Sequence, residues 1–359
     1  MKSTKLSESS RPSANPIYVV WAWFSLLLLL WFAYSGRAMA NDNVPSSTPF
    51  PPHSVYGTAP PVTLLVYSLD PKLLAGWNFP LGGMAGLGMS ASPEYILPAE
   101  QELPVLGGWD PGDTPQLGKL LAARPRLALL WAPYLDRPQL REELQRIGVP
   151  SVAVPLATLE DYPAAFRSVG KLLGVSARGD RLANDFQQIL EHLQQIRTRV
   201  PQNQRKTVYY AEGIDGLMTD SAASPHTQVI RAAGGANVFT AKPTSLKGMQ
   251  QVSMGQVLAW NPDVIIVQDP IFYRRIYSLP AWKGVRAVQT HQVYLVPRAP
   301  FNWMDRPPSF MMGIGSLWLA NILYPQQAKI DMVQATIQFF HQFLQVDLRP
   351  DQAKSILQS

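Results

Sequence analysis

The apolar residues between positions 177 and 199 recur at steps of three and four, with polar residues between them. The apolar positions are Leu182, Phe186, Ile189, Leu190, Leu193 and Ile196. This spacing is typical of a helix that is buried along one side. At about 1.5 Å per residue the helix would be roughly 34 Å long, close to the width of a small domain. A stretch of comparable size lies on each side of it, so the pattern predicts two lobes joined by one long helix.

Residues 62–174 alternate short apolar runs with helical patterns and are expected to form the first lobe. Continuous apolar runs are typical of strands in a parallel sheet that is covered on both faces. The expected strands are residues 62–67, 103–108, 127–131 and 151–154. The expected helices are a short one around 72–76, then 115–123, 139–147, and one capped by Thr158 that ends near Leu173.

Residues 201–359 repeat this arrangement after the linking helix, which we expect over residues 175–200. The expected strands are 207–211, 264–268 and 293–296, and the expected helices are 226–233, 253–259 and 308–323, with further helices toward the C-terminus. Strands that alternate with helices imply right-handed crossover connections. The sequence therefore predicts an α/β fold of two doubly wound lobes with mainly parallel sheets, joined by one long α-helix.

The N-terminal segment has the features of an export signal. Lys2, Lys5 and Arg11 precede an apolar run over residues 17–34, and the small-x-small sequence Ala38-Met39-Ala40 follows it. We interpret residues 1–40 as a cleavable signal peptide. A membrane anchor is the alternative, because the run is near the lower limit for spanning a bilayer. Residues 41–61 are rich in Pro, Ser and Thr and are expected to be a flexible leader.

The chain of 359 residues contains no cysteine, which excludes disulfides, thiolate metal sites and a lipid-anchored N-terminal Cys. Residues 1–40 carry four basic residues and one Glu, so half of the net charge of +6 belongs to the presumed signal. A small remaining charge without basic runs argues against a nucleic-acid partner. Together with the signal, this composition predicts a soluble periplasmic protein. We expect it to be a monomer.

Four phrases of the sequence are distinctive. They are Ala-Ala-Arg-Pro-Arg-Leu-Ala-Leu-Leu at 122–130, Ile-Arg-Ala-Ala-Gly-Gly-Ala-Asn-Val at 230–238, Asn-Pro-Asp-Val-Ile-Ile at 261–266, and Trp-Lys-Gly-Val-Arg-Ala-Val at 282–288, followed by Val293-Tyr294. Their order resembles the substrate-binding proteins of metal-chelate ABC importers, a two-lobed family with a rigid linking helix that serves iron-siderophores, haem and cobalamin. The resemblance covers about residues 62–325. It departs from the family at Arg126, where the usual residue is Asp.

The resemblance implies a transport function rather than an enzymatic one. A member of this family would capture a small-molecule metal chelate and deliver it to a membrane permease with its ATPase, and it would need no catalytic cofactor. A linking helix resists large hinge motions, so lobe closure should be modest. Family members dock through one acidic residue on each lobe, and Asp136 is the candidate for the first lobe. The chain also lacks Gly-x-Ser-x-Gly, His-Glu-x-x-His and P-loop motifs.

Ligands of open α/β sheets bind beyond the carboxyl ends of the strands, so the candidate ligand-binding residues are those that follow the expected strands. They are Trp109, Trp131 and Tyr134 in the first lobe, and Glu212, Asp215, Phe272, Tyr273, Asn302, Trp303, Asp305 and Arg306 in the second. Aromatic walls with a few charges suit a flat or bulky chelate that carries negative oxygen groups.

The segment 300–309 is the strongest candidate for ligand contact. Trp303 would stack on the ligand, and Arg306 would form a bidentate pair with a carboxylate, catecholate or oxoanion. In the alternative interpretation Trp303 belongs to the core of the lobe, and Asp305 pairs with Arg306 ahead of a helix that begins at the following prolines.

Two further side chains are candidate metal ligands. His226 would ligate a metal or hydrogen-bond an anion, although a lone His more often caps or packs. Tyr273 would bind Fe(III) as a phenolate or stack on the ligand, and the neighbouring Arg274 and Arg275 suit a solvated helix face.

Three ligand hypotheses follow from these residues. An iron(III)-siderophore or related chelate comes first. A molybdate-type oxoanion or nickel comes second, with His226, Arg306 and Tyr273 forming a tighter site, and haem or cobalamin comes third. An exported enzyme or scaffold with chelatase-like lobes is an alternative of a different class, and the export signal argues against it.

Overall fold

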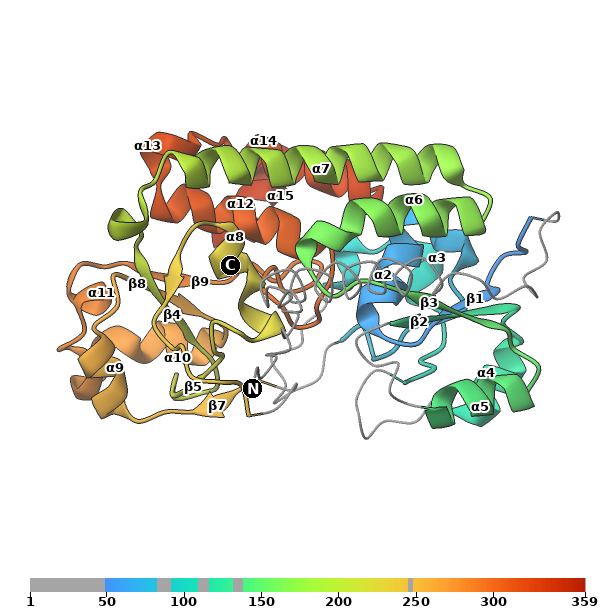
Figure 1. Cartoon of the computed structure of the whole chain (residues 1–359), viewed down its shortest axis with the longest axis horizontal. Coiled ribbons are helices and arrows are strands. Elements are labelled where there is room, and N and C mark those ends of the chain that lie inside the picture. The colour runs from blue at the N-terminus through green and yellow to red at the C-terminus, as the bar shows by residue number, and fades with distance from the viewer. Residues whose placement is uncertain (1–48, 83–91, 109–115, 132–137, 245–247, 359) are drawn as a thin grey trace, which may run out of the picture. The chain divides into compact units, whose positions relative to one another are not determined.

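The computed structural model describes residues 49–82, 92–108, 116–131, 138–244 and 248–358. The proposed signal peptide therefore lies outside the described residues, as do residues 41–48 of the proposed leader. The long helix is α7, Ser176–Thr198, and Figure 1 shows it running past the elements of both lobes. It buries Leu182, Phe186, Leu193 and Ile196. It packs against helices α6, Tyr162–Leu172, and α12, Met311–Leu323.

The first lobe has a parallel three-stranded sheet in the order β1-β2-β3. Its strands are β1 Val55–Gly57, β2 Leu127–Trp131 and β3 Ser151–Val154, and the last two match the prediction residue for residue. The main helices are α2 Pro60–Leu69, α4 Leu117–Ala123, α5 Pro138–Arg146 and α6 Tyr162–Leu172, with a short α3, Pro98–Gln101. The predicted cap at Thr158 is part of a capping box with Asp161.

The start of this lobe differs from the prediction. Residues 62–67 are not a strand but the middle of helix α2, and the first strand, β1, lies inside the segment that we expected to be a flexible leader. All ten residues of α2 are buried, so the helix shows no polar face that would reveal its period. Residues 103–108 contain only a single bridge, between Trp77 and Val105, in place of a strand.

The second lobe has a parallel four-stranded sheet in the order β6-β4-β8-β9. Its strands are β6 Ala236–Asn237, β4 Thr207–Ala211, β8 Val264–Val267 and β9 Val293–Leu295. A short antiparallel pair, β5 Met218–Thr219 and β7 Gln250–Gln251, lies beside it. The helices are α8 Gln228–Ala232, α9 Met254–Trp260, α10 Pro270–Arg275, α11 Arg286–Gln289 and α12 Met311–Leu323, followed by α13 Pro325–Ala328, α14 Met332–Phe339 and α15 Pro350–Gln358. Two α/β lobes joined by one long helix confirm the predicted fold class.

An aromatic cluster joins the lobes beneath the long helix. The ring of Phe186 in α7 lies 6.2 Å from Phe166 in α6 and 6.0 Å from Phe343 near the C-terminus. Phe310, just before α12, lies 6.5 Å from Phe166 and 5.6 Å from Phe343. Buried rings of this size contribute strongly to packing. One core therefore includes α6, α7 and the start of α12, so the lobes are packed on a shared base, and modest closure stays a prediction.

Helix α12 packs directly on the backbone of the loop that precedes it. A Cβ atom added at Gly315 would lie 1.9 Å from the carbonyl oxygen of Trp303. We expect Gly315→Ala to lower the free energy of unfolding by about 1–3 kcal/mol, because the helix must move to relieve the overlap. The matched control is Gly118→Ala in α4, where a Cβ meets nothing within 4 Å and the gain should be about 0.5–1 kcal/mol. Urea denaturation of both variants tests this, and equal effects would contradict the close packing.

Candidate functional site

A buried ionic cluster lies at the carboxyl edge of the second sheet. Nε of Arg306 is 3.0 Å from Oε1 of Glu212 and 3.3 Å from Oδ2 of Asp305, and Nη2 of Arg306 is 3.1 Å from Oδ2 of Asp220. Glu212 follows β4, Asp220 follows β5, and the loop between β9 and α12 carries Asp305 and Arg306. The three carboxylates are fully buried and Arg306 is 8% exposed. One guanidinium therefore draws three segments together.

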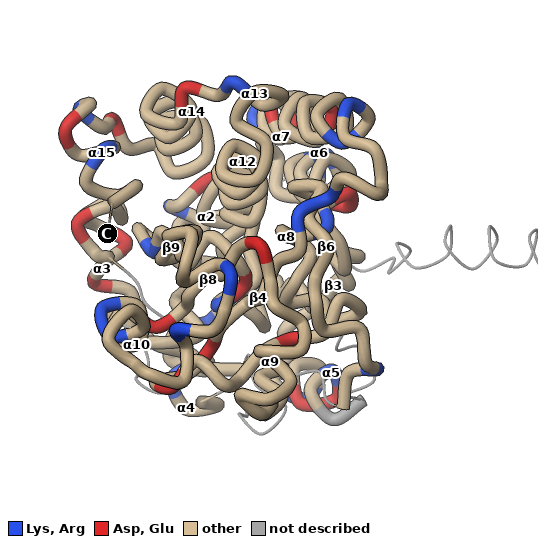
Figure 2. The backbone as a smooth tube through the Cα atoms, turned by 90° about the vertical axis from the view of Figure 1, so that its left-hand side faces the viewer, with Lys and Arg blue, Asp and Glu red and all other residues tan. Residues whose placement is uncertain are grey.

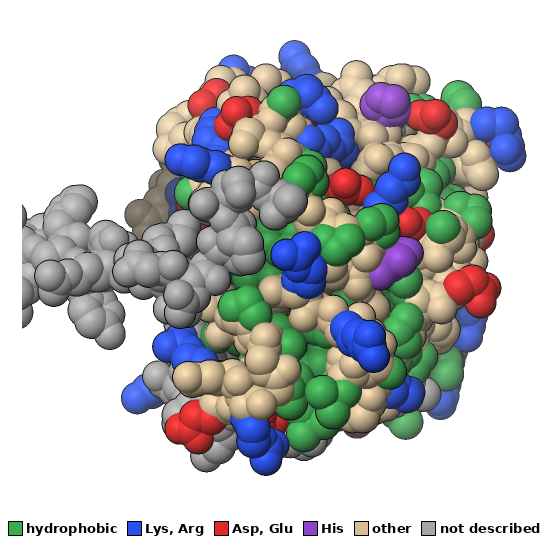
Figure 3. Space-filling model, turned by 90° about the vertical axis from the view of Figure 1, so that its right-hand side faces the viewer, with side chains coloured by type: hydrophobic (Ala, Val, Ile, Leu, Met, Phe, Trp, Pro, Cys, Tyr) green, Lys and Arg blue, Asp and Glu red, His purple; other side chains and the backbone are tan. Residues whose placement is uncertain are grey.

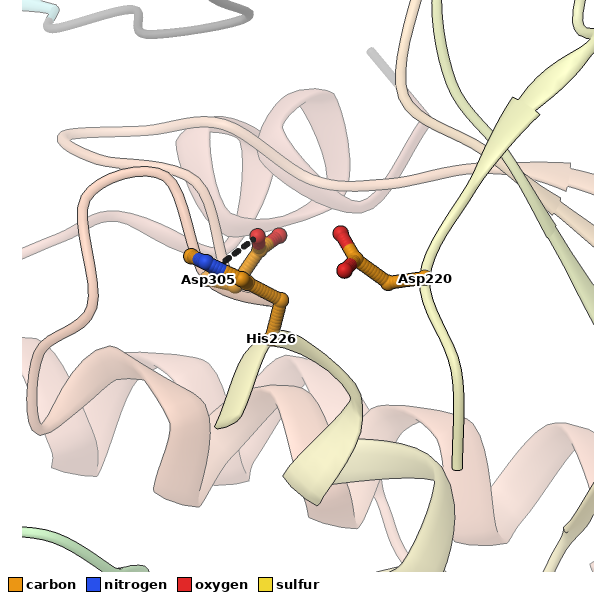
Figure 4. A group of neighbouring side chains, drawn as sticks. All are labelled: Asp220, His226 and Asp305. Atoms are coloured by element: carbon orange, nitrogen blue, oxygen red, sulfur yellow. Dashed lines mark ion pairs between the residues drawn. The ribbon is translucent and has the colours of Figure 1, made fainter. Parts of the chain in front are cut away.

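His226 joins this cluster through Asp305. Its Nδ1 lies 2.9 Å from Oδ2 of Asp305, and the hydroxyl of Tyr210 donates to Oδ1 of the same carboxylate at 2.7 Å. Figure 4 shows the imidazole of His226 directed at Asp305, with the carboxylate of Asp220 facing the pair from the neighbouring segment. The backbone N–H of His226 donates to Oγ of Ser224, which caps the turn. These bonds fix both the position and the orientation of the ring.

The cluster contains more acidic than basic groups, and its protonation follows from burial and neighbours. Burial, together with the charges of Asp305 and Asp220, raises the pKa of Glu212 well above its usual value, despite the attraction of Arg306. Burial also acts to raise the pKa of Asp305, but Arg306 and the bond to His226 outweigh it and lower that pKa. Within the cluster, burial and neighbours therefore favour the protonated form at Glu212 and the ionised form at Asp305.

Burial lowers the pKa of His226, but the hydrogen bond and charge of Asp305 outweigh this effect and raise the pKa overall. The ring is therefore stabilised as an imidazolium that donates to Asp305. A proton on Glu212 and one on His226 reduce the net negative charge of the cluster, which favours both protonated forms in a buried site.

The buried polar atoms beside the cluster that have no hydrogen-bond partner among the described residues include Oε2 of Glu212 and Nδ2 of Asn302. The other oxygen of Glu212 accepts from Gln268 at 3.4 Å, and the amide oxygen of Asn302 accepts from the N–H of Met304 at 2.7 Å. A proton on Glu212 removes the charge that this unsolvated oxygen would otherwise carry, which supports the neutral form.

Asp220, His226 and Asp305 could each offer one atom to a metal ion, because these atoms lie within 4.8 Å of one another. Arg306 already contacts the two carboxylates, at 3.1 and 3.3 Å. A resident metal would have to displace this guanidinium and bear its repulsion. The donor set therefore fits an internal arginine better than a bound cation.

A small pocket lies next to the cluster, between the lobes. The first lobe lines it with Pro61, Trp131, Leu156 and Tyr162, and the second with His226, Pro308 and Met312, among others. The volume of the cavity is about 30 Å³. A single water molecule needs about 10–15 Å³ of such volume, so the cavity has room for only a small solute. Its walls are mainly apolar, and the imidazole of His226 connects it to the buried charges.

Two aromatic side chains shape the first-lobe wall. The indole N–H of Trp131 donates to the carbonyl oxygen of Leu156, which fixes the ring across the loop after β3. Tyr162 is fully buried, and this burial raises the pKa of its hydroxyl far above the usual value. Tyr162 is therefore a neutral wall of the pocket rather than a phenolate ligand.

The candidate residues predicted from the sequence fall into different places in the structure. Trp131 and His226 line the pocket, and Glu212, Asp305 and Arg306 form the ionic cluster. The bonds within the cluster include the Asp305–Arg306 pairing of the alternative interpretation. Trp109, Tyr134 and Asp136 lie outside the described residues.

The remaining aromatic candidates lie elsewhere in the second lobe. Trp303 is fully buried, and its indole N–H donates to the carbonyl oxygen of Ala299 at 2.9 Å, as the alternative interpretation of a core residue requires. Phe272 is also in the core, 4.9 Å from the ring of Trp282. Asn302 is fully buried beside the cluster.

Tyr273 lies in α10 and is half-buried, away from the residues that line the pocket. Arg274 and Arg275 follow it in the same helix and are exposed, and Figure 2 shows basic residues along α10. Asp215 accepts from the N–H of Leu217 and stabilises a turn. These residues belong to the surface of the second lobe.

Sequence analysis missed several residues of the site. Tyr210 and Asp220 belong to the cluster, and Pro61, Tyr162 and Gln228 line the pocket. Tyr210 lies inside a correctly predicted strand, so its position near the carboxyl end of that strand was the available signal. Nothing local marks Asp220, because its role depends on contact with a residue 86 positions away.

The described part of the chain contains no helix long and apolar enough to span a bilayer. On the first-lobe side, basic and acidic side chains are interspersed among apolar ones (Figure 3).

Several characterised proteins are similar to this chain. The molybdate-binding protein MolA of Haemophilus influenzae is 31% identical over 121 residues, which are 33% of this chain and only about a third (34%) of that protein. A vitamin B12-binding protein of Pectobacterium carotovorum is 29% identical over 217 residues, 60% of this chain and 71% of that protein. A solved ABC transporter solute-binding protein from Sulfurospirillum deleyianum is 34% identical, with a TM-score of 0.80 over 87% of this chain and 95% of that chain.

The family model described as periplasmic binding protein matches residues 97–300, which is more than half of the chain. The family and the relatives are transport proteins that bind a substrate, not enzymes. The matched segment contains both sheets apart from β1, the linking helix, and the cluster residues Glu212, Asp220 and His226. The chain belongs to the periplasmic binding protein family, and it is a substrate-binding protein of the ABC transporter type.

Proposed function

We propose that this protein captures a compact metal chelate in the pocket between its lobes and delivers it to the permease of an ABC importer, which is powered by its ATPase. The observation that carries the proposal is the pocket itself. Its walls come from both lobes, and it contains an imidazole that Asp305 holds in one orientation. A solute there contacts both lobes at once, so its binding favours their closed arrangement.

The lining suits a chelate. The organic periphery of a chelate packs against apolar walls such as Trp131, Pro308 and Met312, while its polar centre meets His226. Among the iron(III)-siderophores and related chelates expected from the sequence, the most compact are the first to test, because the present space is only about 30 Å³.

A molybdate-type oxoanion is the second candidate. A relative that is 31% identical over 121 residues is a molybdate-binding protein, and the pocket has room for only a small solute. The raised pKa of His226 supplies a positive donor for an anion. Haem and cobalamin come third, because the lobes would have to separate widely to admit them.

Export and docking complete the proposal. Residues 1–40 would direct the chain to the periplasm and be removed, and Asp136 would be one contact with the permease. The mature protein would act as a monomer. Mass spectrometry of the protein isolated from the periplasm tests the cleavage after Ala40.

Ligand binding is tested by thermal-shift measurements on the mature protein with ferric siderophores, molybdate, nickel, haem and cobalamin. A binder at a hundred times its Kd should stabilise the fold by about 2.7 kcal/mol. Stabilisation by a ferric chelate supports the leading candidate, and stabilisation by molybdate alone supports the second. If no ferric chelate has an effect, the leading candidate is wrong.

We expect His226→Ala to weaken binding of the solute identified by thermal shift about tenfold to a hundredfold. The reason is that a hydrogen bond to a charged group is worth about 1.5–3 kcal/mol. The matched control is His341→Ala, which changes an exposed histidine that is paired with Asp347. Titration calorimetry on folded variants compares the two. Equal affinities in both would exclude a contact between His226 and the solute.

A further inference from the structure

The side chain of Gln228 connects the two lobes. Gln228 is the first residue of α8 in the second lobe, and its Nε2 donates to the carbonyl oxygen of Ala157 at 3.0 Å. Its Oε1 accepts from the N–H of Leu159, also at 3.0 Å. Ala157 and Leu159 follow β3 in the first lobe. Because the amide bonds in both directions, it sets the spacing and the orientation of the two backbones.

The first-lobe end of this connection is itself held firmly. Oδ2 of Asp161 accepts from the backbone N–H groups of Ala157 and Thr158, at 2.9 and 2.8 Å, and from the hydroxyl of Thr158 at 3.1 Å. A loop with this many internal bonds has little freedom to follow the second lobe. The Gln228 amide therefore joins two ordered segments, and its length determines how far apart they lie.

A second link lies one turn further along α8. Arg231 donates to both carboxylate oxygens of Glu160, at 3.2 and 3.3 Å. Both side chains are about half exposed, so this pair adds little stability by itself. The pair forms a second contact between the lobes on the same face of α8 as Gln228, because residues three apart in a helix lie on one face.

The connection forms part of the pocket wall. Ala157, Thr158 and Gln228 line the same pocket as His226, which lies two residues before Gln228. On this side of the pocket, the length of the Gln228 side chain therefore sets the distance between the two lobes. A solute much larger than the present space of about 30 Å³ would have to break both hydrogen bonds of Gln228 before the lobes could part.

We infer that Gln228 is a specificity-determining residue, which holds the lobes at a spacing that admits compact metal complexes or oxometalates and rejects ligands the size of haem or cobalamin. This inference rests on the proposed function and narrows its substrate class. Gln228 selects ligands by their size. It does not bond them directly, since its polar atoms are bonded to the backbone of the first lobe.

The first test needs no ligand. In Gln228→Ala, the N–H of Leu159 loses its acceptor, and we expect its hydrogen exchange to accelerate at least tenfold. Gln188→Ala, which changes an exposed glutamine of α7, is the matched control and should leave this rate unchanged. Gln228→Asn, whose side chain is one methylene shorter, should behave like the alanine variant. Wild-type exchange at Leu159 in both Gln228 variants would overturn the inference.

The second test compares the Kd values of molybdate and haem by titration. We expect the wild-type protein and Gln188→Ala to bind molybdate more tightly than haem, and Gln228→Ala to reduce this preference at least tenfold. Tighter haem binding by the wild type, or an unchanged ratio in Gln228→Ala, would overturn the inference while leaving the binding function intact. If neither these probes nor any ferric chelate, nickel or cobalamin binds the wild type, the proposed function fails and the inference fails with it.

Discussion

Arg306→Ala should lower the free energy of unfolding at pH 7 by about 3–5 kcal/mol, because it leaves buried carboxylates without their cation. Arg306 contacts Glu212, Asp220 and Asp305 at 3.0–3.3 Å, and all three carboxylates are buried. Urea denaturation of the ligand-free protein measures the change. The matched control is Arg349→Ala, which breaks an exposed pair with Asp351 and should have no measurable effect.

The loss of unfolding free energy in Arg306→Ala should depend on pH. Burial acts to raise the pKa of Asp305, but Arg306 and His226 lower it below its usual value in the folded protein. A depressed carboxyl pKa contributes stability that is present above the unfolded pKa, about 3.9, and is lost as the pH falls through the folded value. The wild type therefore loses this contribution in acid, whereas the variant already lacks the part of it that Arg306 supplies. The difference in unfolding free energy between the wild type and the variant should be largest near pH 7 and should narrow below about pH 4. A difference that does not change with pH would contradict the assigned charge of Asp305.

Trp303→Ala should cost about 3–5 kcal/mol of folding stability, the range found for removing a large aromatic side chain from a core. The side chain is fully buried, and its indole N–H is bonded to the carbonyl oxygen of Ala299. The control is Leu121→Ala in α4, where the side chain is 52% exposed and the change should be within about 0.5 kcal/mol.

The same variant separates two interpretations of Trp303. If the residue belongs to the core, stability falls while the folded fraction keeps most of its affinity for the solute. If it stacks on the ligand, affinity falls and stability stays near that of the wild type. Titration below the melting temperature, together with urea denaturation, distinguishes these outcomes.

The strands were predicted well wherever the sequence pattern had a single structural meaning. Residues 127–131, 151–154 and 207–211 are strands with the predicted bounds, because each is a short apolar run between turn or helix signals. The prediction failed at residues 62–67, where a helix that is buried on every side has the same apolar run as a strand. Burial removed the polar positions from which its period could have been recognised.

The candidate site was predicted only in part. Placing ligands at the carboxyl ends of the strands identified Glu212, Asp305 and Arg306. His226 was selected separately, as a histidine at the start of a predicted helix, and the structure brings all four together. The same argument also selected Trp303 and Phe272, which belong to the core. Residue type and strand position identify groups that are able to bind a ligand, but whether a side chain points into a pocket or into the core depends on packing.

By itself, the sequence determined the α/β class, the two lobes and the long helix, because these follow from periodicities that neighbouring residues carry. Only the tertiary structure decided that three carboxylates share Arg306, that Asp305 orients His226, and that Gln228 connects the lobes. These contacts join residues separated by up to 94 positions, and they form only where the fold brings those residues close enough for a hydrogen bond. No local pattern encodes such a distance, so the chemistry of the pocket became visible only in three dimensions.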